Sequence, residues 1–499
     1  MEEPSVTTPA AETLMRIAPW LSDPLRQRRT KIVATIGPAS NSAAVIEQLI
    51  RAGVNVFRLN FSHGDHASHR LAYERVRVAS STMRDPVAVL ADLCGPKMRV
   101  GQFIGGQTEL TTGETVIVTT REVAGTPRLI PSQYEALARD VRPADRVLLD
   151  DGLIELRVLA IEGSEVTCQV VNGGILKDRK GMNLPGVGVS IPAFTAKDRE
   201  DANFALGLGV DFIALSFVRT ASDFDELKAL IATGGHRAHL IAKIERPEAL
   251  VTIEDILDAS DGIMIARGDL GVELPPQVVP IVQRRLIALA RARRKPAIVA
   301  TQMLESMVHN PRPTRAEVSD VSTAVFGGAD AVMLSAESAS GAHPVQAVEM
   351  LDAIARHVEG LQWTEGSFKS IAAHDAVASP ASLPAAIARS IAQLSRDLRV
   401  RSVVVISRTG TTAMAVAAAR PAAPIIAASP DAATCRRSTL LWGTVPVQVD
   451  PAALQDTHAL ARRVAVALGL AGDGQSILLI AGFLPDEAHS TPSITVLRI

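Results

Sequence analysis

The sequence predicts an α/β protein built on a (β/α)8 barrel, with a small β domain inserted into the barrel and a separate α/β domain after it. Eight short apolar runs alternate with helical segments. The runs are rich in Val, Ile and Leu without strict alternation, which is typical of parallel strands buried on both faces. The chain has 499 residues, enough for about three domains of roughly 100–200 residues each. The count of eight units favours a closed barrel over the alternative, an open doubly wound sheet.

Each barrel element is expected from its own pattern. The apolar runs that predict strands are Lys31–Gly37, Asn55–Phe61, Val87–Leu93, Phe212–Phe217, His239–Glu245, Gly262–Gly268, Pro296–Met303 and Ala331–Glu337. Apolar residues recur at helical spacing in Ser42–Ala52, Glu200–Leu208, Asp223–Ile231, Glu248–Ala259, Val278–Arg293 and Val345–His357. Asp, Ser or Thr at the starts and Gly at the ends of several of these segments indicate helix boundaries.

Two regions depart from the barrel rhythm. Residues 95–191 contain VLLDDGLIELRVLAI and EVTCQVVNGGIL, which predict hairpins of a small β-barrel domain. After residue 361, strands at Ser402–Ser407, Pro424–Ser429, Val445–Val449, Ser476–Gly482 and Ile494–Ile499 alternate with helices. We therefore expect a leader at 1–28, the barrel at 29–94 and 192–361, the inserted domain at 95–191 and an α/β domain at 362–499, with a weakly patterned link near 366–384.

Composition narrows the function classes. Lys and Arg number 51 and Asp and Glu 53, so the net charge of −2 provides no basic field for nucleic acid. The three cysteines are widely spaced, which favours a reducing compartment. No apolar run reaches the ~20 residues of a membrane helix, and the N-terminus lacks the apolar core of a secretion signal. A soluble cytoplasmic protein that binds neither membrane nor nucleic acid is expected.

Polar side chains gather where the predicted strands end. In a (β/α)8 barrel these ends form one face, on which active sites lie. A single Lys-x-Glu pair or Arg-Gly-Asp loop would more often be a surface feature, but so many polar residues at one end of one barrel favour an active site. The residues are Arg58, Asn60, Ser62, His63, Asp92, Lys97, Arg99, Ser216, Lys243, Glu245, Arg267, Gly268, Asp269, Thr301, Gln302, Ser335 and Glu337.

The residue types at this face indicate a chemistry. Glu245 and Asp269 are hard oxygen ligands with no His or Cys nearby in sequence, which suits Mg²⁺ or Mn²⁺ and argues against zinc. Arg58, Arg99 and Lys243 supply positive charge for an anionic substrate. A divalent metal among cations favours phosphoryl transfer, although neither a Walker A motif nor a kinase Gly-rich loop is present.

At this point the sequence closely resembles the pyruvate kinase family. The matching stretches run from the first barrel strand to the last: TKIVATIGPAS (30–40), NVFRLNFSHG (55–64), GMNLPG (181–186), KIE (243–245), SDGIMIARGDLGVELP (260–275), ATQMLESM (300–307), PRPTRAEVSDV (311–321) and GADAVMLSAESASGAHP (328–344). The resemblance implies transfer of a phosphoryl group from phosphoenolpyruvate to ADP, giving pyruvate and ATP. This is the last step of glycolysis, and a homotetramer under allosteric control is implied with it.

The resemblance also implies roles for single residues. Lys243, Arg58 and Thr301 would be the catalytic residues. Lys243 would stabilise the transition state, and Arg58 would hold the phosphate of phosphoenolpyruvate. Glu245 and Asp269 would bind the divalent metal. The remaining implied contacts are Ala266, Arg267, Gly268, Asp269 and Thr301 for the substrate and Asn60, His63, Arg99, Lys180 and Asp151 for the nucleotide. Asp151 and Lys180 belong to the inserted domain, which in the family is a lid that closes over the barrel and excludes water.

One departure from the family pattern concerns K⁺. Many members bind K⁺ through the positions of Asn60, Ser62, Asp92 and the carbonyl of Leu93, and carry Glu where this chain has Lys97. A lysine ammonium is a compact monovalent cation, so we expect Lys97 to replace K⁺ and the enzyme not to require it. In the alternative, Lys97 points into solvent and K⁺ binds.

The C-terminal region contains SRTGTTAMA (407–415), a Ser/Thr/Gly loop that opens a helix. Such a loop can bind a phosphate through backbone N–H groups and hydroxyls, or it can be an ordinary capped loop. By resemblance it is the site of a phosphorylated allosteric effector, with Ser407, Thr409, Gly410, Thr411 and Thr412 as candidates. The family's second effector loop departs in this chain (LPDEAHSTPS, 484–493).

Two other functions fit part of the pattern. A metal-dependent lyase acting on pyruvate or oxaloacetate would also use Glu and Asp with Mg²⁺, but Lys180 in an inserted lid argues against it. A metabolite-sensing protein without catalysis is disfavoured because Lys243, Glu245, Asp269 and Thr301 are all present. ADP-dependent turnover separates these alternatives from phosphoryl transfer.

Overall fold

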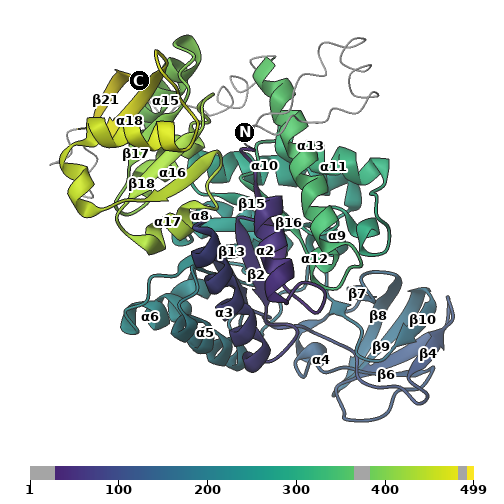
Figure 1. Ribbon diagram of the computed structural model, residues 1–499. Helices are drawn as coiled ribbons and strands as arrows, with labels where there is room; N and C mark the ends of the chain where they lie inside the picture. Colours follow the sequence, from purple (N-terminus) through teal and green to yellow (C-terminus); the bar gives the residue numbers. More distant parts are fainter. Residues whose placement is uncertain (1–27, 365–382, 482–491) are drawn as a thin grey trace.

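A closed barrel of eight parallel strands lies at the centre of the computed structural model, which describes residues 28–364, 383–481 and 492–499 (Figure 1). The strand order is β1-β16-β15-β14-β13-β12-β3-β2, so the predicted barrel is confirmed. The strands are β1 (Lys31–Thr35), β2 (Val56–Asn60), β3 (Ala88–Asp92), β12 (Phe212–Leu215), β13 (His239–Ile244), β14 (Gly262–Ala266), β15 (Ala297–Ala300) and β16 (Ala331–Leu334). Most of the expected leader (1–27) and most of the expected link (365–382) lie outside the described residues.

Helices cover the barrel, and local signals set their ends. The hydroxyl of Ser42 accepts a hydrogen bond from Val45 N at the start of the first helix, which ends at Gly53 with φ 109°. The segment expected as one helix at 248–259 is two helices, because the chain breaks at Thr252. The helices are α2 (Ala43–Ala52), α3 (His66–Met83), α5 (Ala196–Leu208), α6 (Asp225–Thr233), α7 (Pro247–Val251), α8 (Ile253–Ala259), α9 (Arg267–Glu273), α10 (Val279–Ala292), α11 (Arg315–Phe326), α12 (Ala336–Ala339) and α13 (Pro344–Thr364). Among the described residues, no helix is long and apolar enough to cross a membrane.

The interior of the barrel is a packed apolar core. Side chains such as Val33, Leu90 and Met264 fill it, and each is fully buried. Leu440, which lies far along the chain in the C-terminal region, belongs to the same cluster and is also fully buried. The C-terminal region therefore supplies part of the barrel's own core.

The inserted segment forms two sheets. The larger has the order β11-β7-β8-β9-β5-β6, and a separate ribbon pairs β10 with β4, so the small β-barrel expected here is not one closed ring of strands. The predicted hairpin at 147–161 is present as β7 and β8, whereas β10 pairs with β4 and not with β9. The elements are β4 (Gln107–Leu110), β5 (Thr115–Thr119), β6 (Leu129–Pro131), α4 (Leu137–Asp140), β7 (Arg146–Leu149), β8 (Ile154–Glu162), β9 (Glu165–Asn172), β10 (Gly174–Lys177) and β11 (Met182–Asn183).

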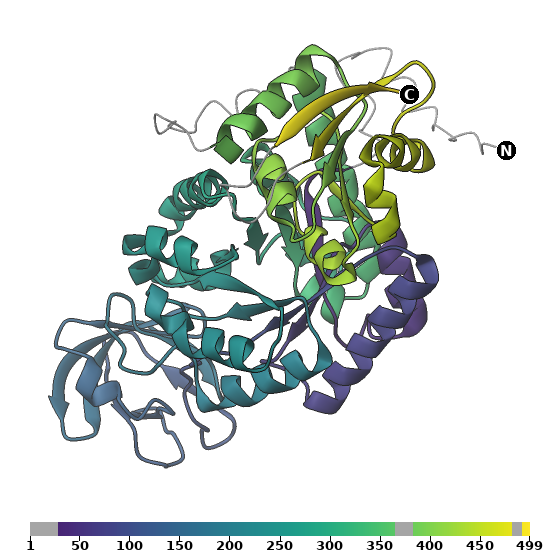
Figure 2. The same ribbon diagram turned by 90° about the vertical axis from the view of Figure 1, so that its left-hand side faces the viewer.

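The C-terminal region is an α/β layer on the other side of the barrel from the inserted sheets (Figures 1 and 2). Its five-stranded sheet has the order β19-β18-β17-β20-β21, in which only β21 is antiparallel to its neighbour. The elements are α15 (Leu383–Asp397), β17 (Val403–Ile406), α16 (Thr411–Ala418), β18 (Ile425–Ser429), α17 (Ala432–Ser438), β19 (Thr444–Gln448), α18 (Thr457–Ala467), β20 (Ser476–Ala481) and β21 (Ser493–Arg498).

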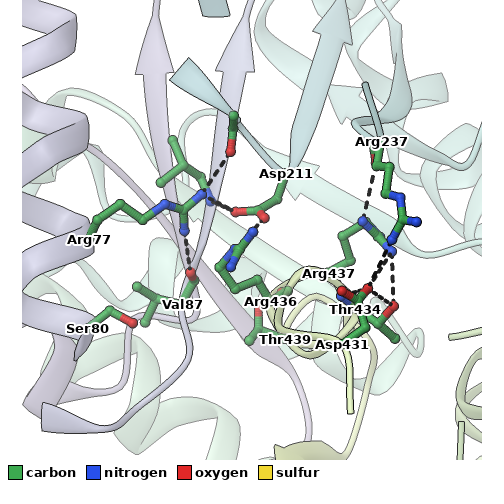
Figure 3. Close-up of polar contacts among 12 residues, drawn as sticks. Arg77, Ser80, Val87, Asp211, Arg237, Asp431, Thr434, Arg436, Arg437 and Thr439 are labelled. Carbon is green, nitrogen blue, oxygen red and sulfur yellow. Dashed lines mark hydrogen bonds and ion pairs between the residues drawn. The ribbon is translucent and has the colours of Figure 1, made fainter. Parts of the chain in front are cut away.

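Ion pairs join this layer to the barrel (Figure 3). Asp211, which directly precedes β12 and is 2% exposed, accepts from Arg77 on α3 and from Arg436 on α17, each at 2.7 Å. Lys31, at the start of β1, is buried and donates to Thr444 O at 2.6 Å. Because these contacts lie where the barrel strands begin, they leave the opposite face of the barrel free for the site.

Candidate active site

Lys243 lies at the centre of the polar face formed by the strand ends. Its side chain is 12% exposed, and its Nζ lies 2.8 Å from Glu245 Oε1 and 3.3 Å from Asp92 Oδ1. The ammonium also donates to Ser216 Oγ at 2.7 Å. Although burial lowers the pKa of Lys243, the charges of Asp92 and Glu245 outweigh burial and raise it above the ordinary value. Lys243 therefore stays charged.

Arg58 reaches the same cluster from β2. Its Nε pairs with Asp92 Oδ2 at 2.6 Å, and its Nη1 donates to Thr35 Oγ1 at 3.0 Å. Burial would raise the pKa of Asp92, but Lys243 and Arg58 together bring it below its usual range. One carboxylate thus holds two cations side by side, which suits a dianionic phosphate.

The carboxylate of Glu245 is 1% exposed and oriented from two sides. Lys243 contacts Oε1, and the backbone N–H of Phe217 donates to Oε2 at 2.7 Å. Burial raises the pKa of Glu245, against the opposing effect of Lys243, and the nearby charge of Asp269 raises it further. Two carboxylates that repel each other across a site are stabilised by a divalent cation. The donor set therefore fits Mg²⁺ or Mn²⁺ completed by substrate oxygens.

Asp269 and the predicted substrate loop lie at the junction of β14 and α9. Gly268 N donates to Thr301 Oγ1 at 2.7 Å, and Thr301 in turn donates to Ala300 O at 2.6 Å. Thr301 has a φ of 68° and the next residue, Gln302, a φ of 53°, both in the left-handed region. Left-handed backbone at non-glycine residues is uncommon and concentrates at functional sites. Arg267 is buried and pairs with Asp320 at 2.6 Å, so its guanidinium is turned toward α11.

Most of the predicted nucleotide residues line one cleft of about 280 Å³ between the inserted sheets and the barrel. Lys180 Nζ pairs with Asp150 at 2.7 Å, and Arg99 donates to Arg179 O at 2.8 Å. The predicted residues in the lining are Lys97, Arg99, Asp151, Lys180 and Asp269. Asn60 and His63, at the end of β2, are not among the lining residues. The cleft brings basic side chains of the inserted region to within reach of the polar face.

Two of the oxygens expected to bind a monovalent cation already accept hydrogen bonds from the protein. Asn60 Oδ1 accepts from Ser62 N at 3.2 Å, and Leu93 O accepts from Ser216 Oγ at 2.7 Å. Lys97 is exposed and makes no ion pair with Asp92 in the part of the chain that the structure describes. Burial lowers the pKa of His63, and the charge of Lys97 lowers it further, so the ammonium lies near the end of β2.

The predicted effector loop lies at the opposite end of the barrel from this site. Ser407 and Thr412 are buried, while Thr409 and Thr411 are exposed with their hydroxyls 3.1 Å apart. Gly410 has φ 95°, which a side chain would strain. The candidate loop at 484–493 falls almost wholly outside the described residues.

Three contacts escaped the sequence prediction. Thr35 ends β1 and contacts Arg58, so all eight strands contribute to the face. The predicted run Lys31–Gly37 extends two residues beyond β1, so it does not place the threonine at the strand end. The backbone N–H of Phe217 leaves no mark in a sequence. Arg246, beside Glu245, binds Glu273 on α9 at 3.2 Å and Val187 O at 2.9 Å, and its place after the KIE motif was a signal that could have been used.

Comparison with known proteins adds independent findings. Residues 27–348 match the family model for the pyruvate kinase barrel domain, and residues 385–497 match the model for the pyruvate kinase alpha/beta domain. The chain is 44% identical to pyruvate kinase 2 of Synechocystis over 94% of this chain and 79% of that protein. It is 43% identical to the pyruvate kinase of Corynebacterium efficiens over 94% and 98% of the two chains. The crystal structure of a pyruvate kinase from Cryptosporidium parvum superposes with a TM-score of 0.87 at 34% identity, over 94% of this chain and 96% of that one.

Proposed function

The chain belongs to the pyruvate kinase family, and from that premise we propose how its residues transfer a phosphoryl group from phosphoenolpyruvate to ADP. The reaction gives pyruvate and ATP. The observation that carries the assignment of roles is the position of Lys243, whose ammonium lies between Asp92, Glu245 and Ser216. This cation is mostly buried, with 12% of its side chain exposed, and its raised pKa keeps it charged.

Lys243 and Arg58 neutralise the phosphoryl group. Charge on the transferred group spreads over its oxygens in the transition state, and catalysis comes mainly from positioning and charge neutralisation. Arg58 holds the phosphate of phosphoenolpyruvate, since its guanidinium is fixed by Asp92 and Thr35. Lys243 stabilises the group during transfer.

Glu245 and Asp269 are the proposed ligands of Mg²⁺ or Mn²⁺. When bound, such an ion supplies a positive charge that neutralises phosphoryl and carboxylate oxygens. The N–H of Phe217 and the ammonium of Lys243 hold the Glu245 carboxylate in place. The carboxylate end of the substrate binds the loop formed by Ala266, Arg267 and Gly268, together with Thr301. The N–H of Gly268 donates to Thr301 Oγ1, and the substrate carboxylate replaces this oxygen as its acceptor.

Arg99, Lys180 and Asp151 bind the nucleotide in the cleft between the inserted sheets and the barrel. Asn60 and His63, at the end of β2, contact the nucleotide from outside the lining of this cleft. Closing the inserted domain over the barrel excludes water and so suppresses hydrolysis of phosphoenolpyruvate. Lys97 supplies a monovalent charge near the end of β2, which removes the need for K⁺. A phosphorylated effector binds the loop Ser407–Thr412, and the protein is a homotetramer.

A coupled assay of pyruvate formation with the Lys243→Met variant tests this assignment. We expect kcat to fall by orders of magnitude while the Michaelis constant for phosphoenolpyruvate changes little, because the charge acts in the transition state. Omitting ADP should abolish turnover, whereas a lyase would remain active without ADP. A rise in the Michaelis constant alone would make Lys243 a ground-state binding residue and contradict the role.

A further inference from the structure

Ser216 directly follows β12 and is 1% exposed. Its Oγ lies 2.7 Å from Leu93 O and 2.7 Å from Lys243 Nζ. An ammonium can only donate and a carbonyl can only accept, so both hydrogen-bond directions are fixed. The hydroxyl gives its proton to Leu93 O and turns a lone pair toward Lys243. It therefore has one orientation.

The ammonium of Lys243 has three N–H groups and three oxygen neighbours. Two are carboxylates that form ion pairs with it, Asp92 at 3.3 Å and Glu245 at 2.8 Å, and each has a second role. Asp92 holds Arg58, and Glu245 is a proposed metal ligand. Ser216 is the neutral acceptor, and it fixes the third direction of the ammonium. Without it, the ammonium is free to rotate and shift between the two carboxylates.

The backbone that carries Ser216 is held rigidly. Phe217 has a φ of 56°, and in this left-handed conformation its N–H reaches Glu245 Oε2 at 2.7 Å. A Cβ on Gly95 would lie 2.8 Å from both Ser216 Cβ and Phe217 Cδ2, so only glycine permits this close packing. Two consecutive residues thus orient the proposed catalytic lysine and the proposed metal ligand from one short segment.

We infer that Ser216 is a positioning residue for phosphoryl transfer, which holds the Lys243 ammonium at the point where it meets the transferred group. The inference rests on the proposed role of Lys243 and extends it to a neutral neighbour. A small displacement of a charged group reduces its stabilisation of the transition state more than its binding of the substrate. Loss of the hydroxyl therefore acts on kcat.

The test compares Ser216→Ala with Ser338→Ala. Ser338 is a matched control, because it is fully buried near the end of β16 and donates to Thr35 O at 2.9 Å, but has no contact with Lys243 among the described residues. We expect Ser216→Ala to lower kcat about tenfold or more with less than about a threefold change in the Michaelis constant for phosphoenolpyruvate. Ser338→Ala should lower the melting temperature similarly and leave kcat within about twofold. Ser216→Cys, with its weak thiol acceptor, should lie between Ser216→Ala and wild type, and it decides the question if Ser216→Ala does not fold.

A double variant shows whether Ser216 acts through Lys243. Coupled residues are not additive, so adding Ser216→Ala to Lys243→Met should leave the residual kcat unchanged. A Ser216→Ala enzyme with wild-type kcat, or with only a raised Michaelis constant, or with its full effect retained beside Lys243→Met, would overturn the inference. If Lys243→Met itself keeps wild-type kcat, the proposed role of Lys243 fails as well; if Lys243→Met is severe and Ser216→Ala is silent, only the inference fails.

Discussion

Charge balance at single residues decides the chemistry of this site. Lys243 and Arg58 both form ion pairs with Asp92, and Lys243 also forms one with Glu245. The charge of Asp269 acts on Glu245 as well. Two cations and three carboxylates leave a surplus of negative charge before substrate arrives. A divalent cation bound here would remove this surplus and give the phosphoryl group a face with net positive charge.

The metal assignment predicts the effect of neutral substitutions. Glu245→Gln and Asp269→Asn should each reduce turnover by orders of magnitude at saturating Mg²⁺, because each removes a charged oxygen ligand while keeping its shape. Circular dichroism and melting temperature should show that both variants fold. Near-normal turnover in either variant would show that its carboxylate is not a metal ligand.

From the presence of Lys97 we predict that enzyme activity does not depend on K⁺. The wild-type enzyme should be active in Na⁺ or tetramethylammonium buffer, and Lys97→Glu should make its activity depend more strongly on K⁺. The charge of Lys97 lies near the end of β2, so reversing its sign should be measurable in the rate.

Titration of activity with KCl in both proteins is the measurement. Leu93 and Cys94 limit how fully Lys97→Glu recovers, because neither offers a hydroxyl as an extra ligand. A wild-type enzyme that is inactive without K⁺ and activated many-fold by it would show that the exposed Lys97 side chain stays in solvent.

At the scale of elements, two arginines of the barrel hold the chain where the inserted region returns to it. Arg219 donates to Val189 O and, at 3.1 Å, to Ile191 O. Arg246 donates to Val187 O at 2.9 Å. Both side chains line the cleft that receives the proposed nucleotide. The segment that returns from the inserted region to the barrel is therefore held by hydrogen bonds to its backbone carbonyls.

Arg219→Met should release this segment. We expect faster amide hydrogen exchange at residues 187–191 and a higher Michaelis constant for ADP by about threefold to tenfold, since ordering the lid then opposes binding. Arg199→Met is the control, because Arg199 is exposed and pairs with Glu226 on the neighbouring helix without contacting the segment. Equal exchange in the two variants would show that Arg219 does not restrain the lid.

Elements also show what a sequence can and cannot predict. Short apolar runs located all eight barrel strands, since burial on both faces leaves a run of apolar residues. They did not reveal that β10 leaves β9 to pair with β4, because partner choice depends on strands distant in the chain. The places of Lys243 and Glu245 in the site were predictable from their residue types and their position at a strand end. The hydrogen bond from Phe217 N to Glu245 was not, because it depends on a left-handed φ that the residue type does not indicate.

At the scale of the whole molecule, the barrel and the C-terminal region share a buried polar seam. Lys31 donates to Thr444 O, and Arg420 is fully buried and pairs with Asp330 at 2.9 Å. Burial, with the charges of Arg28 and Arg29, lowers the pKa of Lys31 from 10.5 to about 7, although the charges of Glu359 and Asp85 oppose this. The seam therefore contains a group that titrates near neutral pH.

Lys31→Met should change the pH dependence of stability. Between pH 7 and 10.5 the unfolded chain keeps the Lys31 proton and the folded protein does not. The stability of wild type relative to Lys31→Met therefore rises with pH across that window, by up to roughly 1.4 kcal/mol per unit, and is lowest below pH 7. Melting temperatures of both proteins from pH 6 to about 9.5 give the difference, and a constant difference would contradict the prediction.

Leu440 has a consequence for anyone who recombines genes of this family. It fills the floor of the barrel although it is encoded far downstream of β16. A chimera that joins the barrel of one relative to the C-terminal region of another at residue 364 would exchange this side chain together with Arg436, the partner of Asp211. Crossovers that keep the stretch 434–444 with its own barrel preserve both Leu440 and the ion pair between Arg436 and Asp211. The segments that can be exchanged between relatives therefore do not coincide with the barrel and the C-terminal region.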